Sequence, residues 1–520
     1  NPYKFLVTNP LGQEVEHHFW ETYGLKKPSE YIVRESGNIE EATFDPRISS
    51  GQFIEFTDPY GNEIHWNRDS KGRPTLTTYL AGTGDEFQVQ TTWHPLHYRP
   101  TQVVRPGLTA DMVYGANGEL LSQTLTDTSG QGSSVRTTAY TYTVNGLLDT
   151  VDGSLSGAGD SYSYTYTALG YLASITNPNG QTTTFSNHTG SGLPQSVTSP
   201  NGLQSQISYN ARGWVTTIAE SDGSSTRTTS FQYDAAGNVT RMTLPTGGFF
   251  DYTYDGNSWM TQVASSAGET IAYTHDNLGN VTSKTVAGGS GQAGFSGSYT
   301  YDSLGRLISA LNVGGTTQYG YNKRNELTSI TDPTGAVWSH SFDGLGRLIR
   351  TVEPDGDQQN IGVDTNGAPT SFQDGNQFTT TYVRNGFGEV VQEVSPDRGT
   401  TTYSYDNAGR TVAISPADGN AVTFSYDSAG RLIGKTFLAD SSKNQIFAYD
   451  QSTNGQGRLT TATDIHGTTT YIYNGFGDVI SEARVLGGQT YTTSFGHNGL
   501  GQVTSITYPS GREVQITRDA

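Results

Sequence analysis

One short motif recurs along the chain at an almost constant interval, and this period constrains the fold more than any other feature. The motif at residues 301–307 reads Tyr-Asp-Ser-Leu-Gly-Arg-Leu, and close copies occur at 342–348, 405–410 and 426–432. Its glycine position falls at 305, 325, 346, 367, 388, 409 and 430, so the first step is 20 residues and the others are 21. A fixed step of this size is typical of repeat proteins, in which each repeat stacks on its neighbours. The residues that define the motif are Tyr233, Asp234, Gly237, Tyr301, Asp302, Gly305, Arg306, Phe342, Asp343, Gly346, Arg347, Tyr405, Asp406, Gly409, Arg410, Tyr426, Asp427, Gly430 and Arg431.

A second turn signal lies between successive motifs. Proline followed two residues later by glycine occurs at 178 and 180, at 333 and 335, and at 354 and 356. Proline presets φ for the second position of a type I turn, and glycine suits the fourth. Each period therefore predicts a strand, a Pro-Gly turn, a second strand and a Tyr-Asp turn, with almost no helix. The glycines at 305, 346, 409 and 430 are expected to have positive φ, because Asn325 is the residue that replaces glycine in one copy.

The geometry of such a chain favours a curved wall. Two strands of about six residues span roughly 20 Å each, and each strand widens a sheet by about 4.8 Å. Some twenty repeats would make a sheet on the order of 200 Å wide, which must curl because strand twist accumulates. Charged residues are 15% of the sequence, against about 25% in an average domain, and Gly contributes 64 of 520 residues. These polar, small-residue faces suit an all-β, spiralling sheet that forms a hollow shell with water on both sides.

Charge and composition exclude several classes of protein. The net charge of −19 and the pI near 4.8 disfavour nucleic acid as a partner. The sequence has no apolar run long enough for a transmembrane helix, and it has no Cys for disulfides or thiolate metal sites. The chain starts without Met and ends at Ala520, before the next glycine position expected at 522, so we expect a fragment cut within a repeat.

The motif Tyr-Asp-x-x-Gly-Arg-Leu resembles the signature of the Rhs or YD-repeat proteins. The resemblance is clear over residues 113–520 and degenerate over 1–112, where Asn9-Pro10-Leu11-Gly12 and Asp58-Pro59-Tyr60-Gly61 still echo the turns. We therefore expect a degenerate N-terminal β-region at 1–112 and a YD-repeat β-shell at 113–520. The family includes bacterial polymorphic toxins, among them type VI secretion effectors, toxin-complex components and wall-associated toxins, together with animal teneurins.

The resemblance implies a role in encapsulation and delivery. In the bacterial toxins the repeats form a cocoon that holds a C-terminal toxin domain, so the implied partners are that cargo and a secretion spike or chaperone. The implied location is secreted or delivered at the bacterial cell surface, in competition between bacteria. These shells typically end in an Asp-Pro-x-Gly autoprotease core, which is expected beyond residue 520. Asp58-Pro59 and Asp332-Pro333 match its first two letters but occupy ordinary repeat positions, so a structural role is expected.

Other apparent motifs are better explained by the repeat. His94-Pro95-Leu96-His97 and His17-His18 have no acidic or Cys partners nearby in sequence, so we predict no metal site and no cofactor. The segment 289–294 matches a dinucleotide-binding pattern but precedes no helix, and it is expected to be a loop. Asp364-Thr365-Asn366-Gly367 resembles the start of a calcium loop, yet it occupies a repeat turn.

The repeated polar residues are expected to be structural. The Asp of each Tyr-Asp pair should cap the backbone of its own turn. The Arg after each Gly is expected to pair with the Asp of a neighbouring repeat, and the tyrosines to stack on one another. Two function classes remain: a non-enzymatic shell that encapsulates a toxin, and a β-solenoid that serves in surface adhesion, glycan binding or action on polysaccharides. A cargo domain beyond residue 520 would favour the first, and a cell-wall anchor the second.

Overall fold

The computed structural model describes residues 3–8, 14–22, 25–35, 38–44, 53–58, 60–132, 134–157, 159–288 and 294–518, with the backbone alone before residue 54. The echo at 9–12, Pro59, residues 289–293 of the dinucleotide-like segment, and the last two residues lie outside this description. So do the side chains of His17 and His18. The described chain is almost entirely strand and turn, with one short 3-10 helix, η1 (Ser441–Lys443). The prediction of a β-protein with almost no helix is confirmed.

The strands are short and follow one another at repeat spacing. Those of the first half are β1 (Tyr3–Thr8), β2 (Glu14–Thr22), β3 (Leu25–Glu35), β4 (Asn38–Phe44), β5 (Phe53–Thr57), β6 (Glu63–Arg68), β7 (Pro74–Tyr79), β8 (Phe87–Trp93), β9 (Pro100–Arg105), β10 (Leu108–Tyr114), β11 (Leu120–Asp127), β12 (Val135–Tyr142), β13 (Leu148–Asp152), β14 (Tyr162–Tyr166), β15 (Leu172–Thr176), β16 (Thr182–Ser186), β17 (Ser196–Thr198), β18 (Gln204–Tyr209), β19 (Val215–Ser221), β20 (Thr226–Tyr233), β21 (Val239–Thr243), β22 (Phe249–Tyr254), β23 (Met260–Ser265), β24 (Thr270–His275) and β25 (Val281–Ala287). Those of the second half are β26 (Phe295–Tyr301), β27 (Leu307–Asn312), β28 (Gly315–Tyr321), β29 (Leu327–Thr331), β30 (Val337–Phe342), β31 (Leu348–Val352), β32 (Gln358–Val363), β33 (Pro369–Gln373), β34 (Thr379–Arg384), β35 (Val390–Ser395), β36 (Gly399–Tyr405), β37 (Thr411–Ser415), β38 (Val422–Tyr426), β39 (Leu432–Phe437), β40 (Gln445–Tyr449), β41 (Leu459–Asp464), β42 (Gly467–Tyr473), β43 (Val479–Leu486), β44 (Gln489–His497), β45 (Val503–Thr507) and β46 (Glu513–Gln515).

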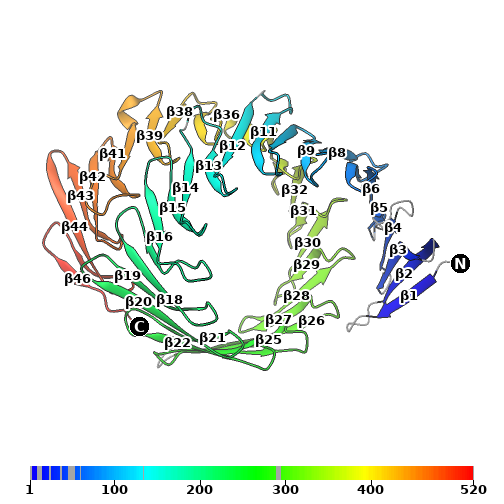
Figure 1. The fold of residues 1–520 in the computed structure, drawn as a ribbon, viewed down its shortest axis with the longest axis horizontal. Coiled ribbons are helices and arrows are strands. Elements are labelled where there is room, and N and C mark those ends of the chain that lie inside the picture. Colours follow the sequence, from blue (N-terminus) through cyan, green and yellow to red (C-terminus); the bar gives the residue numbers. More distant parts are fainter. Residues whose placement is uncertain are drawn as a thin grey trace. The chain divides into compact units, whose positions relative to one another are not determined.

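Strands that follow one another in sequence pair antiparallel, so the chain runs as a succession of hairpins (Figure 1). In a typical pair, β29 and β30 place Ser329 opposite Ser339 and Ile330 opposite Trp338. These pairings link the strands into one antiparallel sheet. The alternating Thr, Val, Ile and Tyr of the strands suit this arrangement, because β-branched and aromatic side chains pack well on a pleated surface.

Both predicted turns have the same backbone geometry. In the Tyr-Asp turn, the Gly305 N–H donates to the Asp302 carbonyl at 3.0 Å, and the Asp302 N–H donates to the Arg306 carbonyl at 3.0 Å. In the Pro-Gly turn at 332–336, the equivalent distances are 3.0 Å and 2.9 Å. The glycines at 305, 346, 409 and 430 have φ between 75° and 83°, and Asn325 has φ of 64°, so the predicted positive φ values are confirmed.

The two ends of the hairpins differ in one respect. Before the Tyr-Asp turn, Tyr301 pairs with Leu307 while Thr300 pairs with Ser309, so Ile308 is an extra residue that forms a β-bulge. The same shift occurs in the hairpins that end at Phe342 and Tyr426. The register through the Pro-Gly turn between β29 and β30 is unbroken. Because a bulge bends a strand and increases its twist, its repetition at one end of the hairpins favours curvature of the sheet.

The sheet has little dry interior. Among the described residues the buried hydrophobic side chains are Leu80, Leu108 and Ala310. The strands β29 and β31 are half-buried at every position, rather than buried and exposed in alternation. This pattern is that of a single layer whose side chains are covered by their neighbours within the sheet.

The chain divides into two units, each made of two segments far apart in sequence. Unit 1 comprises residues 1–138 and 298–403, and unit 2 comprises residues 139–297 and 404–520. The expected contrast between 1–112 and 113–520 concerns the regularity of the repeat and stays a prediction. Within the described residues, no helix is long and apolar enough to cross a membrane.

Candidate functional site

The repeat Asp caps its own turn, as the sequence predicts. Asp302 Oδ1 accepts hydrogen bonds from the backbone N–H groups of Leu304 at 2.9 Å and Arg306 at 3.0 Å, and its Oδ2 accepts from Arg306 Nε at 2.6 Å. Burial acts to raise the pKa of Asp302, but these hydrogen bonds outweigh it and the net pKa is lowered. The turns that begin at Asp234, Asp343 and Asp406 are capped by the same pair of backbone hydrogen bonds. In the turn that begins at Asp427, the Arg431 N–H donates to the Asp carboxylate, whereas the Ala429 N–H donates to Asn179.

The prediction that each Arg pairs with the Asp of a neighbouring repeat is wrong for most copies. Arg306, Arg347 and Arg410 pair with the Asp of their own turn, four residues earlier. The tight turn places both side chains on the same side, so the nearest carboxylate is the local one. The guanidinium then reaches the next repeat through other acceptors, such as the Asp427 carbonyl at 3.2 Å from Arg410 Nη1. Arg431 differs, because it pairs with its own Asp427 and also with Asp450 of the next repeat, each at 2.7 Å.

The predicted stacking of tyrosines on one another is wrong at Tyr426 and Tyr233. The Tyr426 ring lies under the guanidinium of Arg410, 4.8 Å from the ring centre, and its hydroxyl donates to the Thr411 carbonyl at 2.7 Å. Burial raises the pKa of Tyr426. Where Trp214 follows the turn glycine, it covers Tyr233 of the next repeat at 5.3 Å. The residue after the turn glycine thus covers the aromatic ring of the next repeat, and a cation serves this purpose as well as a second ring does.

The structure places the other predicted motif residues at equivalent positions. Tyr301, Phe342 and Tyr405 each end a strand directly before the capping Asp, as Tyr233 and Tyr426 do. Gly237, like the other motif glycines, has positive φ. A side chain at Gly237 would also meet the Trp214 ring, since a β-carbon there would lie 2.8 Å from it.

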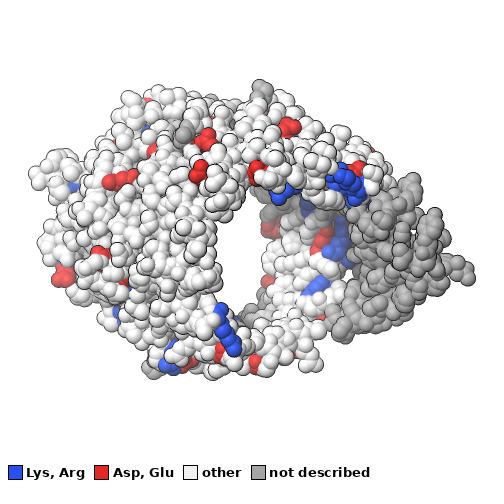
Figure 2. Space-filling model, in the orientation of Figure 1, with Lys and Arg blue, Asp and Glu red and all other residues white. Residues whose placement is uncertain are grey.

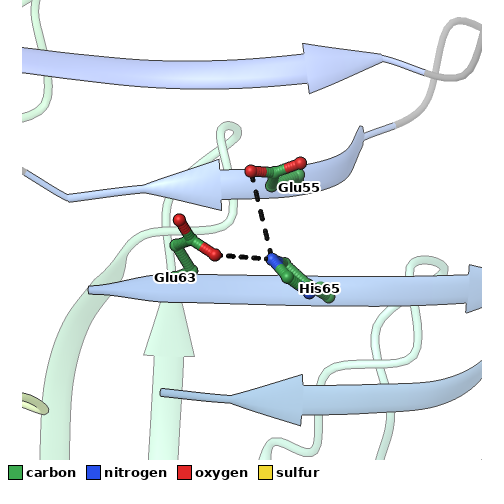
Figure 3. A group of neighbouring side chains, drawn as sticks. All are labelled: Glu55, Glu63 and His65. Carbon is green, nitrogen blue, oxygen red and sulfur yellow. Dashed lines mark hydrogen bonds and ion pairs between the residues drawn. The ribbon is translucent and has the colours of Figure 1, made fainter. Parts of the chain in front are cut away.

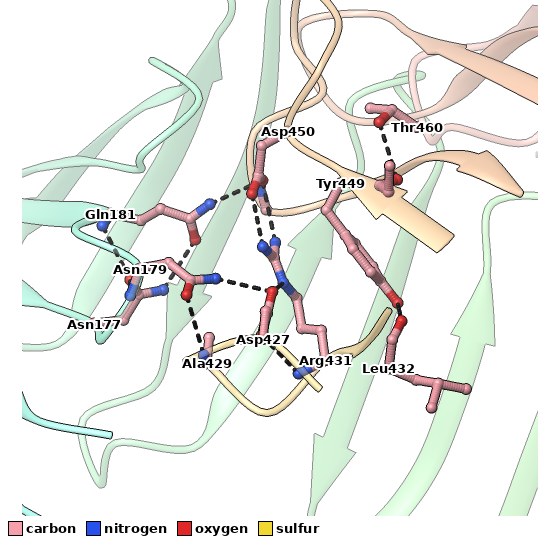
Figure 4. A network of polar contacts seen from close by, with 12 residues as sticks. Asn177, Asn179, Gln181, Asp427, Ala429, Arg431, Leu432, Tyr449, Asp450 and Thr460 are labelled. Atoms are coloured by element: carbon pink, nitrogen blue, oxygen red, sulfur yellow. Dashed lines mark hydrogen bonds and ion pairs between the residues drawn. The ribbon is translucent and has the colours of Figure 1, made fainter. Parts of the chain in front are cut away.

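In unit 2, turns from the two segments meet along a line that we call the unit 2 seam (Figure 4). The Pro-Gly turn of the first segment inserts Asn179 against the Tyr-Asp turn of the second. Asn179 Nδ2 donates to Asp427 Oδ2 at 3.1 Å, and the Ala429 N–H donates to Asn179 Oδ1 at 3.1 Å. Beside them Gln181 Nε2 donates to Asp450 Oδ1 at 2.8 Å. The two segments are therefore joined by amide side chains that form hydrogen bonds with both backbone and carboxylate groups.

These contacts hold the acidic residues of the seam in their charged form. The hydrogen bond from Arg431 is the main cause of the lowered pKa of Asp450. Burial acts to raise the pKa of Asp427, but hydrogen bonds from Arg431 and Asn179 give a net lowering. The bond with Asp450 in turn raises the pKa of Arg431. Asn179, Gln181 and these three charged groups form one connected network.

A second kind of seam contact, made by an Arg, a Phe and an acidic residue, is present among the described residues of both units. In unit 2, Arg227 forms an ion pair with Asp478 and lies 3.9 Å from the centre of the Phe476 ring. In unit 1, Arg136 pairs with Glu389 at 2.8 Å and lies 3.9 Å from the Phe387 ring. All four charged side chains are 15–17% exposed. We call these two constellations the Arg–Phe–acid locks; the partners within each are about 250 residues apart.

Close backbone approach accompanies each lock. The Gly386 N–H donates to Asp127 Oδ1 at 2.8 Å, and a β-carbon at Gly386 would lie 1.9 Å from the Gly107 carbonyl oxygen. A β-carbon at Gly475 would lie 2.2 Å from Asp222 Cβ. Both glycines belong to turns that read Asn-Gly-Phe-Gly followed by an acid, at 385–389 and 474–478. The sequence reasoning missed these residues, although this repeated variant, with an acid in place of the usual Arg, was a visible signal.

The turns of the two segments of unit 1 also meet along a line, which we call the unit 1 seam. This seam contains a further ion pair. Arg324 Nη1 lies 3.2 Å from Asp58 Oδ2 and also donates to the Gly344 carbonyl at 2.6 Å. The Tyr60 ring lies beneath the same guanidinium, 4.9 Å away. On the face shown in Figure 2, charged residues are sparse among uncharged ones, so such pairs are local features of a largely neutral surface.

The apparent catalytic and metal motifs occupy turns. Asp58 and Asp332 each cap a turn through two backbone N–H groups, as does Asp364. His94 Nδ1 accepts hydrogen bonds from the backbone of Leu96 and His97 at 3.2 and 3.1 Å. One polar atom of each of Asp58, Asp332, Asp364 and His94 is thus engaged in holding a loop.

One cluster that the sequence reasoning missed joins two neighbouring strands, β5 and β6 (Figure 3). Glu55 lies directly opposite His65, and Glu63 lies two residues before it on the same face. His65 Nε2 is 2.9 Å from Glu63 and 4.0 Å from Glu55, and the three potential ligand atoms lie within 4.8 Å of one another. Imidazole and carboxylate are zinc ligands, so the group could supply three of four positions of a tetrahedral site. The three residues are half-buried, and His65 is within hydrogen-bond distance of Glu63 but not of Glu55.

Comparison with known proteins agrees with this geometry. The family model "Teneurin YD-shell" matches residues 269–428 and 372–519, and "RHS Repeat" matches 209–248 and 233–270. No curated protein sequence matches the chain. The chain belongs to the Rhs/YD-repeat family.

Solved structures show the same fold in toxin complexes. The fold is similar to chains in the "Crystal Structure of TcdB2-TccC3-Cdc42" and in the Photorhabdus luminescens Tc holotoxin pore carrying the mutation TccC3-D651A. Both have a TM-score of 0.57 and 13% identity, and they cover 95% and 98% of this chain. The match spans 32% and 34% of those chains, so this chain covers about a third of their length.

Proposed function

We propose that this chain is part of the wall of a shell that encapsulates a toxin domain carried C-terminal to it and helps to deliver that domain. The role is structural, and this chain itself performs no catalysis. The toxin domain is the cargo and main partner, with a secretion spike or chaperone as the delivery partner. The place of action is outside the producing cell or at its surface.

The observation that carries this proposal is the combination of a single β-layer with locked seams. Three buried hydrophobic side chains among the described residues are too few for a packed globular core. The stability of the sheet must therefore come from contacts within the layer and between its edges. A wall of this kind suits a container better than it suits an enzyme, whose site needs a rigid supporting core.

The seams supply what a container wall needs. They join turns about 250 residues apart by ion pairs and by hydrogen bonds to backbone groups. Such contacts tie the turns of neighbouring segments together, which supports a continuous wall. The Asp side chains of the repeat accept hydrogen bonds from the backbone of their own turns, which supports a structural role for them.

Protease protection in the full-length gene product tests this function. We expect sequence downstream of residue 520 to resist trypsin while the shell is intact. Replacing both lock cations, Arg136→Ala with Arg227→Ala, should accelerate its digestion, whereas Arg398→Ala should not, because Arg398 is 74% exposed. Equal digestion of the downstream sequence in all three proteins, at the rate of that sequence expressed alone, would contradict encapsulation.

A further inference from the structure

The group of Glu55, Glu63 and His65, which we call the Glu–Glu–His triad, lies on one face of the hairpin formed by β5 and β6 (Figure 3). Glu55 is directly opposite His65, and Glu63 precedes His65 by two residues, so all three side chains leave the same face of the sheet. The register between the two strands is unbroken here. The spacing of the three side chains is therefore fixed by the backbone ladder and not by a loop.

The triad brings two carboxylates together without a basic side chain that balances both. Glu63 and Glu55 lie 2.9 and 4.0 Å from His65 Nε2, and among the described residues neither glutamate forms an ion pair with a Lys or an Arg. Like charges on paired strands are destabilising. A divalent cation held between the two carboxylates would neutralise both of them.

Three other hairpins with Pro-Gly turns show that the strand pairing itself needs no such group. Around the turns at 332–336 and 177–181, the equivalent positions are uncharged and hold Ser329, Val337 and Ser339, and Ser174, Thr182 and Thr184. Around the turn at 244–248 the cross-strand pair is charged, but Arg241 faces Asp251 and the two charges compensate each other. The two glutamates and the histidine therefore have no evident part in forming the hairpin.

The ligand types and their spacing favour zinc. Zn²⁺ binds His nitrogen and Glu oxygen at about 2.0–2.2 Å, so neighbouring ligand atoms of a tetrahedral site lie about 3.3–3.6 Å apart. The three ligand atoms of the triad lie within 4.8 Å of one another. The Glu55 and Glu63 side chains are 42% and 39% exposed, so rotation about their torsions can bring both oxygens to the required spacing. Ca²⁺ and Mg²⁺ prefer oxygen ligands alone, which makes the imidazole a poor match for them.

We propose that the Glu–Glu–His triad binds one Zn²⁺ ion through His65 Nε2 and one carboxylate oxygen of each glutamate, with water in the fourth position. The ion would join β5 to β6 next to the unit 1 seam. The turn between these strands carries Asp58, which pairs with Arg324 at 3.2 Å, and Tyr60, whose ring lies beneath the same guanidinium. Bound zinc should therefore steady the hairpin at this part of the seam. The inference does not depend on encapsulation, because the ligands belong to a single hairpin.

Calorimetric titration of the whole chain with ZnCl₂ tests the site. We expect saturable binding of one Zn²⁺ per chain, which His65→Thr and Glu55→Ser should each weaken by at least about tenfold because each removes a ligand. Both variants introduce the residue found at the equivalent position of the 174–184 hairpin, so they should fold as the wild type does. His466→Gln is the matched control, because it removes another exposed imidazole and should leave binding unchanged.

Hydrogen exchange provides a second readout that locates the ion. Saturating Zn²⁺ should slow exchange of the amides of β5, β6 and the turn at 58–62 in the wild type, but not in His65→Thr. The amides of β20, which belongs to unit 2, serve as an internal reference and should exchange at the same rate with and without zinc.

Three results would overturn the proposal. The first is no saturable Zn²⁺ binding by a wild-type chain that is shown to be folded by circular dichroism. The second is zinc binding of unchanged affinity in both triad variants, which would place the ion elsewhere in the chain. The third is slowed exchange of β5 and β6 that is the same in His65→Thr as in the wild type.

Discussion

The Arg–Phe–acid lock of unit 2 gives the sharpest prediction about what holds the wall together. Removing one partner of a fully buried ion pair costs about 3–5 kcal/mol, whereas an exposed pair contributes about 0–1 kcal/mol. Arg227 and Asp478 are 16% and 17% exposed, so their pair falls between these limits. The Phe476 ring at 3.9 Å adds a cation–π contact of about 0.5–2 kcal/mol. We therefore expect Arg227→Ala to lower the local free energy of opening by about 2–4 kcal/mol.

Native-state hydrogen exchange measures this local free energy directly. The amides to follow are those of the turn at 474–478 and of β20, which carries Arg227. A double-mutant cycle with Arg227→Ala and Asp478→Asn should give a coupling energy of about 1–3 kcal/mol, as for residues in direct contact. Glu393 and Arg398 provide the control, because their atoms are as close, at 2.6 Å, but Arg398 is 74% exposed.

The control pair should couple by at most about 0.5 kcal/mol. A lock coupling no larger than that of the control would refute the reasoning, since the two pairs would then differ in burial without differing in strength. A loss of protection spread evenly over the chain would also contradict it, because the lock acts where two segments meet.

Three further predictions concern the turns and the seam. Gly346→Val should lower the free energy of unfolding by about 1–3 kcal/mol, because φ of 77° is unfavourable for a β-branched residue, while Asn325→Gly should be near neutral; urea unfolding compares them. Tyr426→Phe should cost about 1 kcal/mol in the same assay, through loss of the 2.7 Å bond to the Thr411 carbonyl, and an unchanged midpoint would argue against that bond. Acid should weaken the unit 2 seam: the folded pKa of Asp427 lies below its unfolded value of about 3.9, so the stabilisation is present above that value and is lost as pH falls through the folded pKa. Urea midpoints from pH 6 to 3 should fall less steeply in Asp427→Asn than in the wild type, and equal slopes would contradict this.

The local features of the fold were predictable from sequence because they depend on a few adjacent residues. An Asp four residues before Arg, with Gly between them, allows few alternatives to a capped turn with positive φ at the glycine. Asn325 confirmed this indirectly, as a residue that tolerates the same conformation. The all-β class followed from the same turns, since two of them in every 21 residues leave room only for short strands.

The contacts between repeats were less predictable, because they depend on how the side chains leave the turn. Pairing of Arg410 with its own Asp406, and its position over Tyr426, follow from the direction of the turn and not from the order of residues. The choice between Arg and Trp at that position is understandable only once the ring of the next repeat is seen beneath it.

The seams could not be predicted from the sequence. Which turns meet depends on the total bend of the sheet, and that total adds up a small bend at each of many hairpins. Arg227 pairs with a residue 251 positions later and Arg136 with one 253 positions later. A change of a few degrees per hairpin would bring different turns together. The two Asn-Gly-Phe-Gly-acid turns mark where contact occurs, but their partners become visible only in the structure.

Small-angle X-ray scattering of the purified chain tests the central claim, that this sheet is the wall of a hollow shell. A compact protein of 520 residues should have a radius of gyration of about 24 Å. A hollow shell should have a clearly larger radius and a pair-distance distribution skewed to long vectors, because its mass lies at the periphery. A symmetric distribution with a radius near 24 Å would contradict the shell and the encapsulation proposed from it.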